Sequence, residues 1–546
     1  MRSIRKGTAR STVALVAVVA GMLALAGCSS ASTNAATSKL VSRAPAASGP
    51  VESLTWNLPN GEPDTINPPN AVYYPSAGVV SNLCDPLLAV NENYDLSSNL
   101  VSSKQETPTK LVYTLVAKAT FWDGKPVTVD DIVYSLRQAA DPKSVVSAVY
   151  QNVSSIEATS PTQVTVNFKQ PDELFNSEMA TFAGMVVEKD FAEKAGAKFG
   201  SSAGGIMCSG PYEFVSWTPG DSIKLKKNPD YWNKKVPQHA AAITFRFITD
   251  STAYTQALTA GEIDGSYQIS ASSIPSLQKS KNGAVYFGPS MESWALNVAR
   301  PDGPLADVNL RDALQVSIDR DALARVVFHG AATSNYTELT PRTWPNDQKA
   351  VYQKAYDQWA KKRAFNIDQA KELVKKSKYD SSPVVLGTQA GDETSSTIAQ
   401  LVQQQAKKAG ITVKIDEIQP LQFSTAGYDE ATRKQLGVDL LLTPSFNAAA
   451  DPLEPLGFVY LPDSPYNYTK FDDAKAVSLL NEARQTFDDK KRAQLIVEFQ
   501  DIAEKDSAVI PLVSSNTVTY LNKKLGGAIT SFAYMSMPAL GYIGSK

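Results

Sequence analysis

The stretch Thr394–Ile415, TSSTIAQLVQQQAKKAGITVKI, joins a predicted helix to a predicted strand through a single glycine. Thr394–Ala409 carries apolar residues at helical spacing, Gly410 is a typical helix stop, and Ile411–Ile415 has the composition of a strand. The same alternation of helix and strand extends on both sides. We therefore expect an α/β lobe between about residues 290 and 506. Its other predicted elements are helix Leu310–Phe328, helix Ile367–Lys376 capped by Asn366, strand Pro383–Gly387, strand Val438–Leu442 and a helical region Asp472–Lys505.

The first half of the chain is richer in strands and turns. Thr128–Asp131 resembles a capping box that starts a helix over Ile132–Ala140, and Gly261 ends a helix over Asp250–Ala260. Ala508–Tyr520 returns to a strand pattern near the C-terminus. The predicted strands of this half are Leu111–Val116, Gln163–Phe168, Asp221–Lys226 and Ala242–Ile248. These elements favour a two-lobed α/β protein whose C-terminal strands rejoin the first lobe.

The composition excludes several classes of function. Lys plus Arg total 53 and Asp plus Glu total 55, so the net charge is -2 and no basic excess is left for nucleic acid. The two histidines, His239 and His329, are too few for a multi-histidine metal site, and we expect neither a metal nor a cofactor. The nucleophile elbow, phosphate loop and zinc-protease motifs are absent from the sequence. Paired carboxylates remain open, because the spacing of the acidic residues singles out no pair.

The N-terminus has the pattern of a secretory signal. Four basic residues precede the apolar run Val13–Ala26, which is 14 residues long and too short for a comfortable membrane span. The run ends in Leu-Ala-Gly-Cys28, which resembles a bacterial lipobox; the alternative is a plain secretory signal with an incidental cysteine. We expect a signal peptide over 1–27, lipidation of Cys28, and a flexible tether over 28–52, because this Ser-, Ala- and Pro-rich segment has no apolar period.

Cys84 and Cys208 are the two cysteines that follow Cys28. An even pair in an oxidising compartment favours a disulfide, and two buried free thiols are the alternative. The bridge would close a loop of more than a hundred residues. In the chain-entropy model such a bridge stabilises the fold by about 4–5 kcal/mol.

Five segments form an ordered series along the chain. They are Glu62–Pro68 (EPDTINP), Phe121–Ile132 (FWDGKPVTVDDI), Ser209–Trp232 (with SGPYEF, Trp217 and NPDYW), Ala260–Asp264 (AGEID) and Val308–Arg320 (with VNLRDAL and IDR). Over about residues 53 to 530 the series resembles the family-5 solute-binding proteins, the dipeptide and oligopeptide receptors of ABC importers. Each segment alone is weak evidence, but five in the family's order are highly specific. Most of these motifs are typical of turns and core, so their first role is to build the lobes.

The resemblance implies a two-lobed fold of the periplasmic-binding-protein (Venus-flytrap) type, with hinge strands and a large first lobe rich in strands. The lobes of such a protein close on a ligand by hinge bending. The implied domains are the signal peptide 1–27, the lipidated cysteine and tether 28–52, lobe I 53–288 with an extra subdomain, lobe II 289–506, and a C-terminal return to lobe I over 507–546. Binding would be the only chemistry of this chain.

The resemblance also implies a ligand site in the cleft between the lobes, where strand edges pair with the ligand backbone. Trp294, Phe446 and either Tyr73 or Tyr74 are the candidate aromatic walls. The ligand-binding residues implied by the resemblance are Pro63, Thr65, Asn67 and Asn82 in lobe I, and Trp294, Asn297, Phe446, Asn447 and Asp451 in lobe II.

One departure from the family pattern bears on the ligand. Peptide-binding members commonly carry an aspartate four residues before the proline of a D-x-x-[D/E]-P loop, and its carboxylate pairs with the terminal ammonium of the peptide. Ala448 occupies that place in the loop Ala-Ala-Ala-Asp451-Pro452, unless the alignment slips here. Burying an ammonium without a counter-charge is costly. Either Asp451 or another acid therefore substitutes, or the ligand lacks a free amine, as N-blocked peptides, opines and oligosaccharides do.

The leading hypothesis is a monomeric, lipid-anchored receptor on the outer face of the cytoplasmic membrane. It would hand a peptide or peptide-like solute to ABC permease and ATPase subunits and return it unchanged. One rival is a secreted, lipid-anchored, carboxylate-dependent hydrolase, which turnover would reveal. Another is a receptor for an oligosaccharide or a different solute, and a third is a sensor that signals to a membrane kinase.

Overall fold

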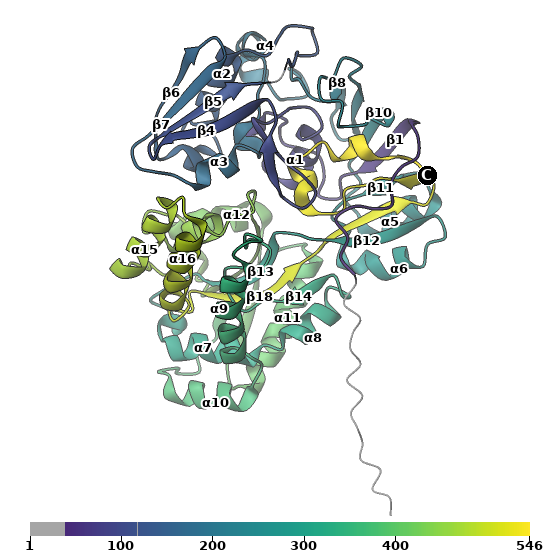
Figure 1. The fold of residues 1–546 in the computed structure, drawn as a ribbon. Helices are drawn as coiled ribbons and strands as arrows, with labels where there is room; N and C mark the ends of the chain where they lie inside the picture. The colour runs from purple at the N-terminus through teal and green to yellow at the C-terminus, as the bar shows by residue number, and fades with distance from the viewer. Residues whose placement is uncertain (1–38, 117) are drawn as a thin grey trace, which may run out of the picture. The chain divides into compact units, whose positions relative to one another are not determined.

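The computed structural model describes residues 39–116 and 118–546. These residues form sheets that are flanked by helices (Figure 1). We call the elements around the seven-stranded and four-stranded sheets lobe I, and those around the six-stranded sheet lobe II. No helix among the described residues has the length and apolar character that crossing a membrane requires.

Lobe I is built on a mixed seven-stranded sheet. Its central strand β1 is parallel to β10 on one side and to β11 on the other, and Leu54 and Trp56 of β1 are fully buried. The C-terminal strand β19 inserts between β12 and β11. Residues 509–515 belong to the six-stranded sheet of lobe II, so the chain rejoins the lobe I sheet only after Ser515 and not from residue 507 as expected. The order across the sheet is β12 (Gly283–Gly288), β19 (Thr517–Asn522), β11 (Gly265–Ser266), β1 (Val51–Asn57), β10 (Ala240–Arg246), β9 (Ser222–Lys227) and β8 (Tyr212–Thr218).

A second, antiparallel sheet of four strands completes lobe I. Helix α2 begins at the predicted capping box: the Thr128 hydroxyl accepts the amide of Asp131, and the Asp131 carboxylate accepts the amide of Thr128. The four strands are β4 (Val101–Thr107), β5 (Lys110–Leu115), β7 (Gln163–Phe168) and β6 (Val153–Ser160); two short pairs are β2 (Leu88–Val90) with β3 (Leu96–Ser98) and β20 (Leu525–Gly526) with β21 (Gly544–Ser545). The helices are α1 (Tyr74–Val80), α2 (Val129–Ala139), α3 (Leu174–Glu178), α4 (Lys189–Ala195), α5 (Ser251–Ala260) and α6 (Ile274–Gln278).

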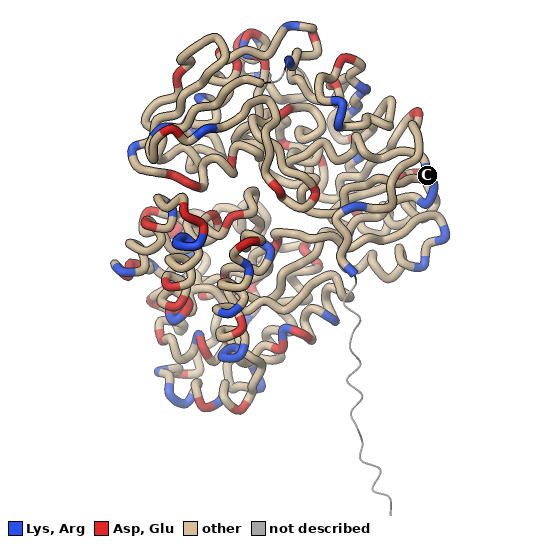
Figure 2. Tube along the Cα trace, in the orientation of Figure 1, with Lys and Arg blue, Asp and Glu red and all other residues tan. Residues whose placement is uncertain are grey.

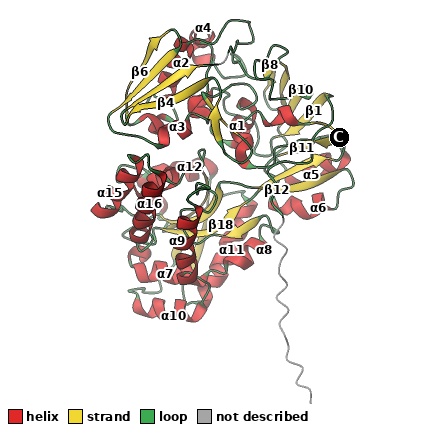
Figure 3. Cartoon of the chain, in the orientation of Figure 1, coloured by secondary structure: helices red, strands yellow, loops and turns green. Residues whose placement is uncertain are grey.

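Lobe II places a six-stranded sheet among helices (Figure 3). The strand order is β14 (Ala332–Ser334), β18 (Val509–Ser515), β13 (Glu292–Val298), β17 (Leu440–Phe446), β15 (Val384–Gln389) and β16 (Val413–Ile418). The helices are α7 (Val308–Ser317), α8 (Arg320–Val326), α9 (Lys349–Lys362), α10 (Ile367–Lys376), α11 (Glu393–Lys408), α12 (Pro420–Tyr428), α13 (Glu430–Leu436), α14 (Leu453–Tyr460), α15 (Ala474–Arg484) and α16 (Asp489–Ala503). Acidic and basic residues are interspersed over these helices (Figure 2).

One predicted helix of lobe II is wrong as a single element, and one predicted helical region is divided into two helices. The helix expected over 310–328 is divided into α7 and α8, because Ile318 turns to an extended conformation and the Asp319 carboxylate caps α8 by accepting the amide of Ala322 at 2.9 Å. The helical region expected over 472–505 is likewise two helices, α15 and α16. The Asp488 carboxylate caps α16 through the amide of Lys491. The apolar spacing continues across both breaks, so it does not reveal them. The N-caps Asp319 and Asp488 mark where the second helix of each pair begins.

Part of the segment expected to be a flexible tether is packed. The amide of Ala44 donates to the carbonyl of Ala528, the amide of Ser48 donates to that of Ser545, and Ala44 is buried. The Arg43 guanidinium lies 4.6 Å from the ring centroid of Tyr542. The composition of 28–52 gave no sign of this packing, because its partners come from the other end of the chain.

Cys84 and Cys208 form a disulfide in lobe I, as the sequence predicts, with their Cα atoms 5.0 Å apart. The neighbouring Asp85 carboxylate accepts hydrogen bonds from Ser209, Tyr231 and Trp232 at 2.8–2.9 Å. The two ends of the Ser209–Trp232 segment, which carries part of the family resemblance, therefore meet at one buried aspartate. Their role here is to build lobe I.

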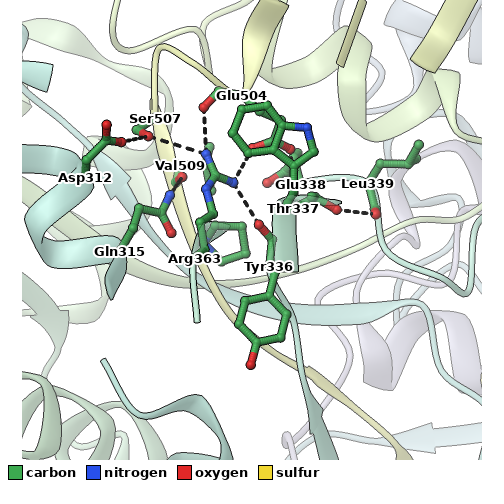
Figure 4. A network of polar contacts seen from close by, with 12 residues as sticks. Asp312, Gln315, Tyr336, Thr337, Glu338, Leu339, Arg363, Glu504, Ser507 and Val509 are labelled. Atoms are coloured by element: carbon green, nitrogen blue, oxygen red, sulfur yellow. Dashed lines mark hydrogen bonds and ion pairs between the residues drawn. The ribbon is translucent and has the colours of Figure 1, made fainter. Parts of the chain in front are cut away.

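A buried network of polar contacts surrounds Arg363 in lobe II (Figure 4). The Arg363 guanidinium pairs with the Glu504 carboxylate at 2.5 Å and donates to the carbonyls of Tyr336 and Glu504 at 2.7 and 2.6 Å. The amide of Glu338 donates to the Glu504 carboxylate at 3.0 Å. The network therefore fixes both the segment that follows β14 and the segment that leads into β18.

We predict that the disulfide contributes strongly to stability. Replacing both Cys84 and Cys208 by serine should lower the free energy of unfolding by about 4–5 kcal/mol, because the bridge closes a loop with a sequence separation of 124. Denaturant unfolding of the two proteins, with and without reductant, measures the difference. The variant should not respond to reductant, and a variant as stable as the oxidised protein would contradict the prediction.

We predict that Glu338 makes stability depend on pH. Burial raises the pKa of its carboxyl to about 8, and the Glu504 carboxylate adds to the effect. In the unfolded chain a glutamate titrates near about 4.3. As pH rises between these values, the unfolded state has released a proton that the native state still holds, so stability falls. Glu338→Gln should flatten the fall in unfolding free energy between about pH 5 and 8.

The matched control for this experiment is Glu417→Gln, because Glu417 is an exposed glutamate of β16. It should leave the slope of the wild-type curve unchanged. Equal slopes for wild type and Glu338→Gln would show that Glu338 is not the group responsible.

Candidate functional site

Strands β13 and β18 connect the two lobes. β13 follows β12 of lobe I after residues 289–291, and β18 runs into β19 of lobe I through Asn516. The two strands are antiparallel neighbours within lobe II, with Ser293 opposite Ser514. Their lobe I ends come together at Glu292, whose carboxylate accepts a hydrogen bond from the Ser515 hydroxyl at 2.5 Å. The region around this contact belongs to both lobes.

Three aromatic rings from three distant parts of the sequence meet at this place. Tyr74 comes from α1, Phe446 from the end of β17, and Phe532 from the short 3-10 helix Phe532–Met535. Their ring centroids lie 5.3 to 6.1 Å apart, at tilted or edge-on angles. Phe446 is a lobe II residue and the other two are in lobe I, so this interlobe aromatic cluster contributes packing energy only when the lobes approach.

A narrow packing gap, with no room for a water-sized probe, lies beside the cluster. It is lined by residues of both lobes: Tyr94, Phe182, Met291, Phe446, Ala448, Phe532, Met535 and Ser536. The Tyr94 hydroxyl is buried here without a hydrogen-bond partner among the described residues. Tyr94 also has a left-handed φ of 67°, which is uncommon for a bulky side chain and occurs preferentially at functional sites. Sites for small molecules usually span about 300–1,000 Å³, whereas this gap has no room for a water-sized probe, so a ligand would have to separate the lobes.

Glu292 is the acidic group of this region. One oxygen of its carboxylate accepts the Tyr74 hydroxyl and the other accepts the Ser515 hydroxyl. Burial raises the pKa of the Glu292 carboxyl, while these hydroxyls and the Trp294 indole act in the opposite direction. Within residues 39–116 and 118–546, no lysine, arginine or histidine forms an ion pair with it.

Arg342 is the basic group of the same region. Its guanidinium donates to the Asn516 side-chain oxygen at 3.3 Å. Burial lowers the pKa of Arg342, and the nearby Tyr94 hydroxyl raises it. No carboxylate among the described residues forms an ion pair with this guanidinium.

The residues implied for lobe I are mostly engaged within the lobe. The Thr65 hydroxyl donates to the carbonyl of Gly200 at 3.2 Å and accepts the amide of Asn67 at 3.0 Å, and Pro63 is buried. The Asn82 amide group donates to the carbonyl of Gly78 and accepts the amide of Leu540. Asn82 thus ties α1 to the C-terminal segment, whereas the Asn67 side-chain oxygen is buried without a partner among the described residues.

The residues implied for lobe II divide into two groups. Phe446 joins the interlobe cluster, and the indole of Trp294 lies close to the Glu292 carboxyl while its ring packs against Phe328. Asn447 is buried in the loop after β17. In contrast, Asn297 donates across the sheet to Thr443 at 2.7 Å, and Asp451 forms an ion pair with Arg492 at 2.8 Å. Of the two tyrosines proposed as walls, Tyr74 is in the cluster and Tyr73 is exposed.

Sequence reasoning did not identify Tyr94, Glu292 and Arg342. Glu292 directly precedes the first crossover strand, next to the predicted Trp294, and this position was the available signal. Tyr94 and Arg342 lie in polar turns far away in sequence, and no pattern connects them.

Comparisons with known proteins give the family. A model of bacterial extracellular solute-binding proteins, family 5 (middle region), matches residues 95–466. The glutathione-binding protein GsiB of Salmonella typhimurium is 26% identical over 487 residues, which cover 88% of this chain and 91% of that protein.

Two solved structures extend the comparison to the fold. The ABC transporter substrate-binding protein CtaP of Listeria monocytogenes superposes with a TM-score of 0.77 at 22% identity, covering 91% of this chain and 99% of that chain. The periplasmic binding protein DppA of Helicobacter pylori, in complex with the peptide STSA, gives a TM-score of 0.76 at 19% identity, covering 91% and 98%. The family model covers more than half of the sequence, so this chain belongs to family 5 of the bacterial extracellular solute-binding proteins, which are substrate-binding proteins of ABC transporters and not enzymes.

Proposed function

We propose that this chain captures a peptide or peptide-like solute between its lobes and delivers it, unchanged, to the permease of an ABC importer. The observation that carries the proposal is the region around Glu292, where both crossover strands, an interlobe aromatic cluster and a packing gap lined by both lobes meet. A solute held there contacts both lobes at once. Its binding energy can therefore hold the lobes closed, which is the state that a permease would recognise.

The relatives support the choice of solute. GsiB is named for glutathione, a peptide, and DppA was solved with the peptide STSA. The aromatic rings of the present site suit the apolar side chains of a peptide. We further propose that the protein acts as a monomer beside permease and ATPase subunits. Cys28, the proposed site of the lipid anchor, lies outside the described residues.

A set of ion pairs between the lobes supports closure as part of the function. Before α3 in lobe I, the Asp172 carboxylate receives two hydrogen bonds of 2.9 Å from Arg484, at the end of α15 in lobe II. The adjacent Glu173 pairs with Arg492 of α16, which also pairs with Asp451. Asp172 and Arg492 are largely buried. We call Asp172, Glu173, Arg484 and Arg492 the interlobe latch.

We predict that weakening the latch opens the protein. Asp172→Asn leaves the Arg484 guanidinium without its bidentate carboxylate only in the closed state, and removing one partner of a buried ion pair is strongly destabilising. The variant should show a larger radius of gyration in small-angle X-ray scattering and bind its solute about tenfold or more weakly. Lys475→Gln is the matched control. Lys475 lies on α15, as Arg484 does, and forms an exposed ion pair with Glu498 of α16. Unchanged scattering and affinity in Asp172→Asn would contradict a latch.

We predict that short peptides stabilise the protein against heat. A solute present at 100 times its dissociation constant should add about 2.7 kcal/mol to the free energy of unfolding. Thermal unfolding of the purified protein with pooled di- to tetrapeptides, with N-acetylated peptides and with oligosaccharides measures this effect. Mass spectrometry of the recovered peptide should show it unchanged. If only oligosaccharides stabilised the protein, its solute would be a sugar and not a peptide. Cleavage of the peptide would contradict the proposal that the protein is a receptor.

A further inference from the structure

The short helix α3 of lobe I is docked against lobe II. The amide of Glu173, just before the helix, donates to the carbonyl of Arg484, at the end of α15, at 2.9 Å. Leu174 is buried in an apolar cluster whose other buried members come from lobe II. Residues four apart lie on one face of a helix, so Glu178 shares the face of Leu174. A carboxyl group is thus carried into the contact between the lobes.

More carboxyl groups than guanidinium groups meet at this contact. The latch carboxylates and Asp451 engage both guanidinium groups. In the part of the chain that the structure describes, no lysine, arginine or histidine forms an ion pair with Glu178 or Glu454. The carboxyl groups are those of Asp172, Glu173 and Glu178 in lobe I and of Asp451 and Glu454 in lobe II, and the guanidinium groups are those of Arg484 and Arg492 in lobe II.

Glu178 and Glu454 repel each other across the contact. Burial raises the pKa of the Glu178 carboxyl well above its ordinary value, and the Glu454 carboxylate is the next largest cause in the same direction. Burial also raises the pKa of Glu454, to about 8, although the amides of Ala448 and Ala449 donate to it at 2.9 and 2.8 Å. Like charges in a buried position disfavour ionisation of both groups. The pair therefore retains a proton at neutral pH while the lobes are in contact.

The neighbouring charged groups leave this repulsion in place. Of the groups that face the pair, Arg484 favours an ionised Glu178, but Asp172 already holds its guanidinium through two hydrogen bonds of 2.9 Å. Asp451 adds a further negative charge, which is itself paired with Arg492. Among the described residues, the groups that face the pair are Tyr150 and Asp172 of lobe I and Asp451 and Arg484 of lobe II.

We propose that Glu178 and Glu454 form a proton switch between the lobes: closure requires a proton on this carboxyl pair, and opening releases it to water. Opening separates the two groups, because one belongs to α3 of lobe I and the other to α14 of lobe II. Water then reaches both carboxyls, and a hydrated glutamate titrates near about 4.3. The inference goes beyond the proposed function, since it concerns the empty protein as well as the loaded one.

Closure should weaken as pH rises. Between about pH 4.3 and 8 the closed state holds a proton that the open state has released. Each unit of pH therefore lowers the equilibrium constant for closure about tenfold for one proton. A solute that binds only the closed state loses affinity in step with the closed fraction. The switch thus ties the strength of capture to the acidity outside the cell membrane.

The test is small-angle X-ray scattering of the purified, solute-free protein from pH 5.5 to 9. Wild type should be compact at pH 5.5, and its radius of gyration should increase as pH rises to about 8. Glu178→Gln keeps the shape of the side chain without a charge, so this variant should stay compact over the whole range. Glu454→Gln should do the same. Glu157→Gln on β6 is the matched control, because Glu157 is an exposed glutamate of lobe I, and it should follow wild type.

A second readout uses pooled di- to tetrapeptides. At pH 8.5 Glu178→Gln should bind the pool about tenfold or more tightly than wild type does, and at pH 5.5 the two proteins should bind it equally. Because the comparison is made at one pH, titration of the peptides themselves cancels from the ratio.

Three results would overturn the switch. One is a wild-type radius of gyration that stays constant from pH 5.5 to 9, whether the protein is open or closed throughout. The second is an increase that Glu178→Gln and Glu454→Gln both retain. The third is an equal loss of the pH response in Glu157→Gln. If a variant fails to fold, the other variant and the wild-type curve still decide. Failure of every peptide pool to bind would refute the proposed solute and leave the scattering result standing.

Discussion

The antiparallel pairing of β13 with β18 is the constraint on which the rest of this structure depends. Both strands belong to the sheet of lobe II, and both continue into strands of the lobe I sheet, β12 and β19. A change in the angle between the lobes must therefore be absorbed by residues 289–291 and by Asn516, where the two strands leave the lobe II sheet. The contact between Glu292 and Ser515 lies directly beside both turns, so the proposed ligand site and the hinge share their residues.

Some buried charged side chains near the hinge have a partner of opposite charge, and others do not. In the latch each buried charge has a partner of opposite sign on the other lobe, as Arg484 has in Asp172 and Arg492 has in Glu173. At the ligand site Glu292 and Arg342 have hydrogen bonds but no counter-ion among the described residues. Closure brings the paired charges of the latch together, because their partners lie on opposite lobes.

Elements decided by local residues could be predicted from the sequence. The capping box of Thr128, the Asn366 cap of α10 and the glycine stop after α11 each involve residues within four positions, and the structure has them all. The site could not be predicted as well, because its partners are distant. Asn82 was expected to face the cleft, yet its amide is engaged by Leu540, which lies 458 positions later. Glu292 is bonded by Ser515, 223 positions later, and no local pattern in the chain records that contact.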